Sequence, residues 1–291
     1  MITFVELGVL GRLGNQLFQY AALKALGLEN GYDVRIPNPA TQVWHNQKCL
    51  LSEFNLECKY YDTDLPLYIK YLYNERDHMN YDPNFWTIAD GTNLKGFFQS
   101  THYFEKHSEQ IKKELTPKPW HLKKAEKKIA EIKAKYPGCD IVSLHLRRGD
   151  NTDGSNISVK LNQMYDSFES DYDEYLEKAL LQFDRRTTKF FVFSGGSRSV
   201  GNDNTADMEW CKKEFSGAEF IFSETNDTME DFCLIRACDH NIISPVSSFG
   251  WWAAYLNPSK EKIVVAPKHY HPDMPEYKHR PGFYPKDWRL L

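Results

Sequence analysis

The sequence lacks a long apolar run and a strong excess of charge of either sign. Its apolar amino-terminal stretch, MITFVELGVL, gives way to Gly11-Arg12 after too few residues for a signal-peptide core or for a membrane helix of about 20 residues. Lys and Arg number 36 against 40 Asp and Glu, so the basic footprint of a general nucleic-acid binder is missing. We therefore expect a cytoplasmic protein without a transmembrane segment or nucleic-acid partner. Peripheral attachment to the inner face of the membrane is the alternative location.

The cysteines show no C-x-x-C pair and no His/Cys cluster at zinc spacing. A chain of 291 residues is also far longer than the secreted domains that depend on disulfides. We therefore expect reduced, mostly buried thiols at all six positions: Cys49, Cys58, Cys139, Cys211, Cys233 and Cys238.

The length and the hydrophobic content of 41% are enough for two domains. The run MITFVEL predicts a buried strand, which a glycine-containing loop connects to a helix over Leu17–Leu28. Residues 40–92 are aromatic-rich and interrupted by prolines, and we expect irregular structure there. The break at Pro137-Gly138, between an amphipathic helix and an apolar strand, divides the chain into domains 1–137 and 138–291.

The second half alternates between strand and helix patterns. Strands are expected at 140–146, 189–194, 219–222, 241–244 and 262–266, with intervening helices at 172–183, 208–215, 229–238 and 249–256. This alternation predicts an α/β fold with a parallel, doubly wound sheet. Ligands of such sheets bind beyond the carboxyl ends of the strands, so the loops that follow the strands are the candidate site.

The strand at 140–146 contains His145 near its end and is followed by Arg147-Arg148-Gly149-Asp150. Two adjacent arginines can grip a diphosphate through charge-assisted hydrogen bonds. The alternative is that they pair with carboxylates such as Asp140 and Asp150 and only hold the domain together.

Two further loops carry polar residues in front of an expected helix. Ser247 and Ser248 fall at a helix start, where they form either an anion site or a simple N-cap. Near the amino terminus, the loop at residues 11–16 has permissive glycines and a helix behind it, but it matches neither G-x-G-x-x-G nor a P-loop. We assign Trp251 and Trp252 to the core.

Four segments occur in a fixed order: GRLGNQLFQYAAL, HLRRGD, FVFSGG and DFCLIRACDHNIISPVSSFGWWAAYL. Together they resemble the α1,2-fucosyltransferases of glycosyltransferase family 11. GRLGNQ, H-x-R and VSSF are also similar to segments of the α1,6- and protein O-fucosyltransferases, which use the same donor, whereas FGWWAAYL favours family 11. The stretch FVFSGGSRSVGND departs from the family by lacking an acidic pair.

The resemblance implies a GT-B-like fold of two Rossmann-like domains that face a cleft, with the acceptor on the side of 1–137 and GDP-fucose bound by 138–291. It also implies transfer of L-fucose from GDP-β-L-fucose to the 2-hydroxyl of galactose in a glycan. The transfer would invert the configuration at fucose C1 and require neither a metal nor another cofactor.

Within the second domain, the resemblance gives Arg147 the catalytic task of binding the β-phosphate and assisting its departure. Asp150, with Asp153 as its substitute, is our candidate for the general base, although a carboxylate beside two arginines is a weak base and can instead orient Arg148. The remaining predicted donor-binding residues of this domain are His145 at the nucleoside, Arg148, Asp231 at the guanine, and Ser247, Ser248 and Phe249 at the diphosphate.

Within the first domain, the resemblance places Asn15 near the fucose, as a third catalytic candidate, with Arg12 and Gly14 shaping its loop. Three alternatives remain open: a fucosyltransferase of another linkage, a non-catalytic GDP-sugar-binding protein, and a nucleotide-dependent oxidoreductase. The missing G-x-G-x-x-G disfavours the last of these.

Overall fold

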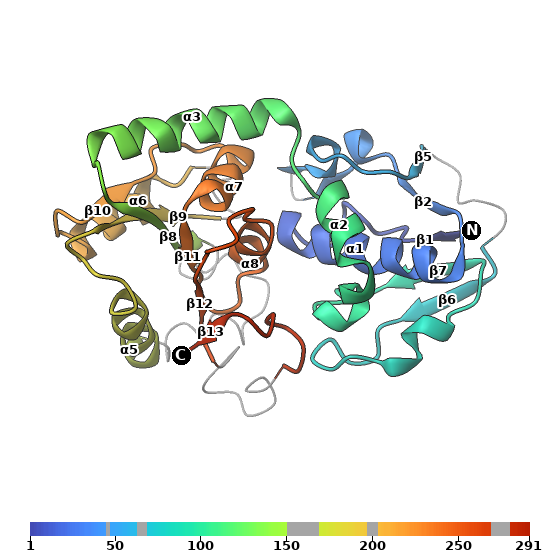
Figure 1. Cartoon of the computed structure of the whole chain (residues 1–291). Helices are drawn as coiled ribbons and strands as arrows, with labels where there is room; N and C mark the ends of the chain where they lie inside the picture. Colours follow the sequence, from blue (N-terminus) through green and yellow to red (C-terminus); the bar gives the residue numbers. More distant parts are fainter. Residues whose placement is uncertain (45–46, 63–68, 150–168, 197–202, 269–279) are drawn as a thin grey trace. The chain divides into compact units, whose positions relative to one another are not determined.

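The computed structural model describes residues 1–44, 47–62, 69–149, 169–196, 203–268 and 280–291. Its contacts divide the chain into two compact units. Unit 1 comprises Met1–Lys118 together with Arg280–Lys286, and unit 2 comprises Pro119–His279 together with Asp287–Leu291. Both units are built around parallel sheets (Figure 1), so the predicted α/β, GT-B-like fold class is confirmed.

The division of the chain differs from the predicted boundary at 137/138. Helix α3 (Pro119–Lys135) packs along helix α7 (Thr228–Ala237) and therefore belongs to unit 2. Ala125 and Ile129 are buried on its inner side, and Lys133 makes a 2.6 Å ion pair with Asp239. The amphipathic pattern of α3 identified a helix with one buried face, but it did not identify the sheet that the helix covers.

Unit 1 contains a five-stranded sheet in the order β5-β2-β1-β7-β6, in which all neighbours are parallel. Its strands are β1 (Ile2–Thr3), β2 (Val34–Pro37), β5 (Lys59–Tyr61), β6 (Tyr71–Asn74) and β7 (Thr92–Lys95). Helix α1 (Leu13–Asn30) is buried along most of its length, which explains its continuous apolar and small residues. Helix α2 (Ser108–Glu114) packs against it.

Short elements fill the region that the sequence predicted to be irregular. An antiparallel pair joins β3 (Val43–Trp44) and β4 (Gln47–Lys48). The unit also has 3₁₀ turns at Pro39–Thr41, Leu51–Glu53, Pro83–Thr87, Thr101–Tyr103 and Glu105–His107. Phe85 of this region is fully buried, and its ring contacts those of Phe98 and Tyr103 further along the chain.

Unit 2 contains a six-stranded parallel sheet in the order β10-β9-β8-β11-β12-β13. Its strands are β8 (Asp140–Leu146), β9 (Thr188–Ser194), β10 (Phe220–Phe222), β11 (His240–Ile242), β12 (Val264–Ala266) and β13 (Arg289–Leu290). Besides α3 and α7, the described part of this unit contains helices α5 (Glu169–Leu180), α6 (Thr205–Glu214) and α8 (Ser248–Tyr255). Trp251 and Trp252 of α8 are fully buried, which confirms their assignment to the core.

Each sheet reverses its strand order at one point. In unit 2 the chain runs outward from β8 through β9 to β10 and then returns to β11 on the other side of β8. In unit 1 the corresponding point lies between β1 and β7. The connecting loops diverge at such a point, leaving a crevice at the carboxyl ends of the strands where ligands bind.

Two simpler expectations can also be compared with the structure. All six cysteines are free thiols, and four of them are buried, as predicted. Among the residues that the structure describes, no helix combines the length and the apolar character needed to cross a bilayer.

Candidate functional site

Ser244 connects the two strand ends at the reversal point of unit 2. Its hydroxyl donates to the carbonyl oxygen of His145 at 2.6 Å and accepts from the backbone N–H of Arg147 at 2.7 Å. Ser244 itself is 1% exposed. The backbone that leads into the two arginines is therefore fixed by a buried side chain from the neighbouring strand connection.

The Arg147 guanidinium is oriented by the loop that follows β9. Its Nη1 atom donates to the carbonyl oxygens of Gly195 at 3.0 Å and of Gly196 at 3.3 Å. Gly195 has φ +131°, and a Cβ atom there would lie 1.9 Å from Oδ1 of Asn204. Only glycine therefore fits, and the FSGG segment, which the sequence did not assign to the site, holds a predicted catalytic arginine.

Arg148 makes the contacts of a loop anchor. Its guanidinium carbon lies 3.7 Å above the centre of the Trp210 ring, and its Nε atom lies 3.4 Å from Oδ1 of Asp207. The same carboxylate accepts from the N–H of Gly149 at 3.0 Å. Burial raises the pKa of Asp207, an effect that the charge of Arg148 opposes. These contacts match the alternative in which one arginine of the pair holds the domain together, with Asp207 as the carboxylate.

The donor-binding role of Arg148 therefore stays a prediction. Asp150 and Asp153, the general-base candidates, lie outside the described residues. The sequence missed Asp207 because it lies on α6, far along the chain from the arginines, and no local motif marks it.

His145 lies beside the start of α8. It is 6% exposed, its Nδ1 atom is 3.4 Å from the Ser247 hydroxyl, and its ring centre is 5.6 Å from that of Phe249. Burial, with a smaller effect of the Arg147 charge, lowers the pKa of His145 to about 3. The imidazole is therefore neutral at physiological pH, and it can bind a ligand by hydrogen bonding or packing rather than by charge.

The loop before α8 is strained in a way that the sequence did not reveal. Val246 has φ +53°, which is rare for a β-branched residue and costs of order 1–3 kcal/mol. Ser247 caps α8 by accepting from the N–H of Gly250 at 3.2 Å. Ser248 and Phe249, which follow it, are half-buried. The first N–H groups of α8 thus lie next to β8, where the helix dipole favours an anion.

Asp231 lies in the first half of α7 and is 8% exposed. The Ser223 hydroxyl, which follows β10, donates to its Oδ1 atom at 2.7 Å. Burial raises the pKa of Asp231 to about 7, despite that hydrogen bond. A buried carboxylate with a pKa so far above its ordinary value is typical of a functional position.

Asn15 of unit 1 lies in the first turn of α1. Its Oδ1 atom accepts from Nε2 of Gln99 at 2.7 Å. Arg12 occupies the N-cap position, where its carbonyl oxygen accepts from the N–H of Asn15 at 2.9 Å, and the adjoining Gly14 is buried within α1. The sequence did not single out Gln99, since a lone glutamine in an aromatic segment carries no recognisable pattern.

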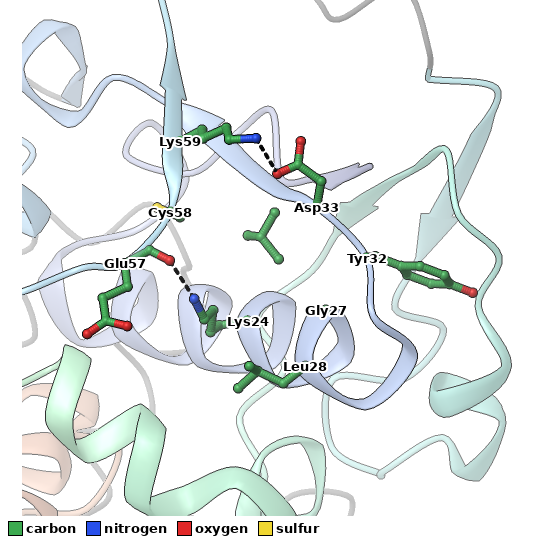
Figure 2. Close-up of a pocket in the computed structure, with 9 residues that line it drawn as sticks. Lys24, Gly27, Leu28, Tyr32, Asp33, Glu57, Cys58 and Lys59 are labelled. Carbon is green, nitrogen blue, oxygen red and sulfur yellow. Dashed lines mark hydrogen bonds and ion pairs between the residues drawn. The ribbon is translucent and has the colours of Figure 1, made fainter.

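A separate pocket of about 380 Å³ lies in unit 1 between α1 and the starts of β2 and β5. Figure 2 shows Lys59 paired with Asp33 and Lys24 hydrogen-bonded to the carbonyl of Glu57 at its rim. The pocket lies at the amino ends of these strands, away from the edge where ligands of parallel sheets bind. It contains none of the predicted site residues.

No group of three or more His, Cys, Asp or Glu side chains that could hold a metal ion occurs among the described residues. The sequence has Asp-x-Asp triplets at residues 62–64 and 171–173. Asp62 is described, but the rest of the first triplet and the side chains of the second are not.

Comparison with known proteins decides the family. The sequence profile described as glycosyl transferase family 11 matches residues 2–291. The chain belongs to this family. The chain is 30% identical over 179 residues to an α-1,2-colitosyltransferase from Escherichia coli, and the alignment covers 59% of this chain and 53% of that protein.

Two animal relatives align over more of the chain. The galactoside α-(1,2)-fucosyltransferase 2 of Rattus norvegicus is 27% identical over 263 residues, covering 85% of this chain and 65% of the relative. The galactoside α-(1,2)-fucosyltransferase 1 of Homo sapiens is also 27% identical over 263 residues, covering 84% and 63%. The family 11 chain thus spans between about half and two thirds of the length of these relatives.

Solved structures share the fold. A variant of Arabidopsis thaliana FUT1 in complex with GDP gives a TM-score of 0.52 at 11% identity, covering 98% of this chain and 74% of that one. The fucosyltransferase NodZ from Bradyrhizobium gives a TM-score of 0.50 at 11% identity, covering 94% and 96%. At this identity the similarity defines the α/β fold alone.

Proposed function

We propose that this family 11 chain transfers L-fucose from GDP-β-L-fucose to the 2-hydroxyl of a galactose in a glycan, inverting C1 and requiring no metal. The observation that carries the proposal is the position of Arg147. Its guanidinium is aligned by the carbonyls of Gly195 and Gly196 at the reversal point of the unit 2 sheet, next to the start of α8. The family match and the fold shared with fucosyltransferases agree with it.

In the proposed reaction, the acceptor hydroxyl attacks C1 from the face opposite GDP. A new bond forms between the acceptor oxygen and C1 while the bond from C1 to the β-phosphate oxygen breaks, and GDP leaves with the electron pair. The hydroxyl proton passes to a base, for which Asp150 remains the candidate. Charge that develops on the leaving diphosphate is stabilised by the guanidinium of Arg147 and the positive end of the α8 dipole.

Selectivity for guanine is proposed to depend on Asp231. Its ionised carboxylate can accept from both N1–H and N2–H of guanine, a donor pattern that adenine and uracil do not offer. Ser223 holds one carboxylate oxygen at 2.7 Å, which fixes the plane of the group. The neutral ring of His145, buried beside Phe249, would contact the nucleoside.

The independence from metal is proposed because Arg147 and the helix start provide the positive charge that a divalent cation supplies in other glycosyltransferases. Because the sequence contains two Asp-x-Asp triplets, independence from metal is tested directly by experiment. The donor sugar also needs a test, because one relative is named as a colitosyltransferase.

The purified protein should be incubated with GDP-fucose or a colitose donor, a panel of galactosides that includes lactose, and EDTA. An α1,2-fucosylated product formed in EDTA supports donor, linkage and metal independence together. A product with another linkage would show that the acceptor is not the 2-hydroxyl of galactose. GDP-fucose binding without turnover would favour a binding protein, and failure to bind GDP would remove the proposal.

A further inference from the structure

An almost buried amide at the start of helix α6 has no hydrogen-bond partner. Asn204 is 9% exposed, and its side chain makes no hydrogen bond with any residue that the structure describes. The fully enclosed polar atoms that lack a partner do not include this amide, so it still reaches solvent. Buried amides in proteins are almost always hydrogen-bonded, because leaving one unpaired is costly. The side chain of Asn204 is therefore available to a ligand.

Asn204 is the N-cap residue of α6, a position at which an asparagine side chain usually accepts from the first backbone N–H groups of the helix. Here it makes no such bond. The carboxylate of Asp203 accepts instead from the N–H of Thr205 at 2.9 Å and from the Thr205 hydroxyl at 2.6 Å. The turn before α6 is thus stabilised without the amide of Asn204.

This amide lies directly against the backbone that holds Arg147. A Cβ atom at Gly195 would be 1.9 Å from Oδ1 and 2.9 Å from Nδ2 of Asn204, so both ends of the amide lie next to this glycine. The carbonyl oxygen of Gly195 in turn accepts from Nη1 of Arg147 at 3.0 Å. Asn204 therefore lies at the carboxyl end of β9, on the edge of the sheet where ligands bind.

The strand order β10-β9-β8 puts Asn204 between two other candidate ligand contacts. Arg147 follows β8, whereas Ser223, whose hydroxyl lies 2.7 Å from the carboxylate of Asp231, follows β10. The backbone N–H of Asn204 donates to Oδ1 of Asn226, in the loop between β10 and α7, at 3.4 Å. A nucleotide whose diphosphate lies at Arg147 and whose base lies at Asp231 has its ribose at the end of β9.

The charges around Asn204 favour a neutral group over a second anion. Asp203 precedes it, and Asp207 lies in the first turn of α6. Hydrogen bonds from Thr205 lower the pKa of Asp203, which is exposed and therefore ionised at neutral pH. Carboxylates beside a helix start offset the attraction of its dipole for phosphate. A hydroxyl group carries no charge, and it can both donate and accept, as the amide can.

We propose that Asn204 is a specificity-determining residue that binds a vicinal diol, namely the two ribose hydroxyls of the nucleotide. Nδ2 donates to the oxygen of one hydroxyl and Oδ1 accepts from the other, a pairing that either orientation of the amide provides. The inference rests on the proposed function and deepens it, by naming the residue that distinguishes ribonucleotides from deoxyribonucleotides. All of the protein groups involved belong to unit 2.

Calorimetric titration with GDP and with 2′,3′-dideoxy-GDP tests this contact. The wild-type protein should bind GDP about 10- to 100-fold more tightly, which is the effect of two neutral hydrogen bonds. Asn204→Ala should lower the affinity for GDP by most of this factor and leave the affinity for the dideoxy nucleotide nearly unchanged. Asn204→Asp keeps two acceptors for the hydroxyl protons, so this variant should still prefer GDP.

Asn226→Ala is the matched control, because it removes an exposed neighbouring amide and should leave the ratio of the two affinities at its wild-type value. If Asn204 only supports the backbone at Gly195, Asn204→Ala lowers both affinities by the same factor, and this result would overturn the inference. Equal binding of the two nucleotides by the wild-type protein would also overturn it, and that measurement does not depend on the folding of a variant.

Fucose transfer by the same preparations separates this inference from the proposed function. Transfer without an effect of Asn204→Ala on the ratio of affinities would overturn the inference alone. A ratio that depends on Asn204 in a protein without transfer would overturn the proposed function and support the ribose contact. If the wild-type protein binds neither nucleotide, both proposals are wrong.

Discussion

Replacing Asp231 by Asn should stabilise the protein while weakening its affinity for GDP. The native carboxyl has a pKa of about 7 against an ordinary value of 3.8, chiefly because it is buried. Between about pH 4 and pH 7, the folded state therefore keeps a proton that the unfolded state has already released. The free energy of unfolding falls as the pH rises through this range. At about 1.4 kcal/mol per pH unit, ionisation costs about 4 kcal/mol at pH 8.

Asparagine keeps the shape of the protonated acid and cannot ionise, so the gain from Asp231→Asn should depend on pH. We expect the substitution to raise the free energy of unfolding by about 4 kcal/mol at pH 8 and by about 2 kcal/mol at pH 5, because pH 5 lies closer to the pKa of the unfolded carboxyl. Urea unfolding followed by tryptophan fluorescence measures both values. Glu224→Gln, which removes the same charge from an exposed neighbour, should change stability by less than about 0.5 kcal/mol.

The same substitution should weaken GDP binding although it stabilises the fold. An amide offers one acceptor where guanine needs two, so GDP affinity should fall about 10- to 100-fold by titration calorimetry. Wild-type affinity for GDP should itself decline below pH 7 as Asp231 takes up its proton. A variant no more stable than wild type at pH 8, or equally stabilised at both pH values, would refute the reasoning about burial.

Three other predictions concern unit 2. Arg147→Ala should abolish fucose transfer while GDP-free thermal stability changes little, and near wild-type turnover would remove Arg147 from the mechanism. Gly195→Ala should lower kcat with a loss of stability, because the new Cβ atom displaces the carbonyls that hold Arg147, whereas Gly138→Ala, where space is open and φ is also positive, reports the backbone strain alone. Because His145 has a pKa of about 3, its titration should not appear near pH 6.5 in the dependence of the rate on pH. A change in rate near pH 6.5 that is present in the wild type and absent in His145→Gln would contradict this pKa.

Local patterns predicted unit 2 well where an element is encoded by its own residues. Strand β8 has the predicted bounds, because the apolar run from Ile141 begins shortly after the break at Pro137-Gly138. Strand β13, with two residues, has no pattern long enough to recognise, and its place depends on pairing with β12. Residues 40–92 were unclear for the same reason, since their short elements are held by contacts with distant segments.

The candidate site divides in the same way. Residues next to a strand end, such as Arg147 and Ser247, could be found from position and residue type. Asp207 and Gln99 could not, because each acts on a loop remote in sequence through a side-chain contact. The strain at Val246 is likewise a property of the folded backbone that residue type does not report.

The return of residues 280–286 to unit 1 has a consequence for how the protein is made. Phe283 of this segment is almost fully buried and stacks on Phe18 of α1, and Gly282 accepts from the N–H of Thr101 at 2.7 Å. Unit 1 therefore cannot complete its core until residues 280–286 have left the ribosome. Synthesis of residues 280–286, rather than of the first 118 residues alone, is the event that allows this unit to reach its native state.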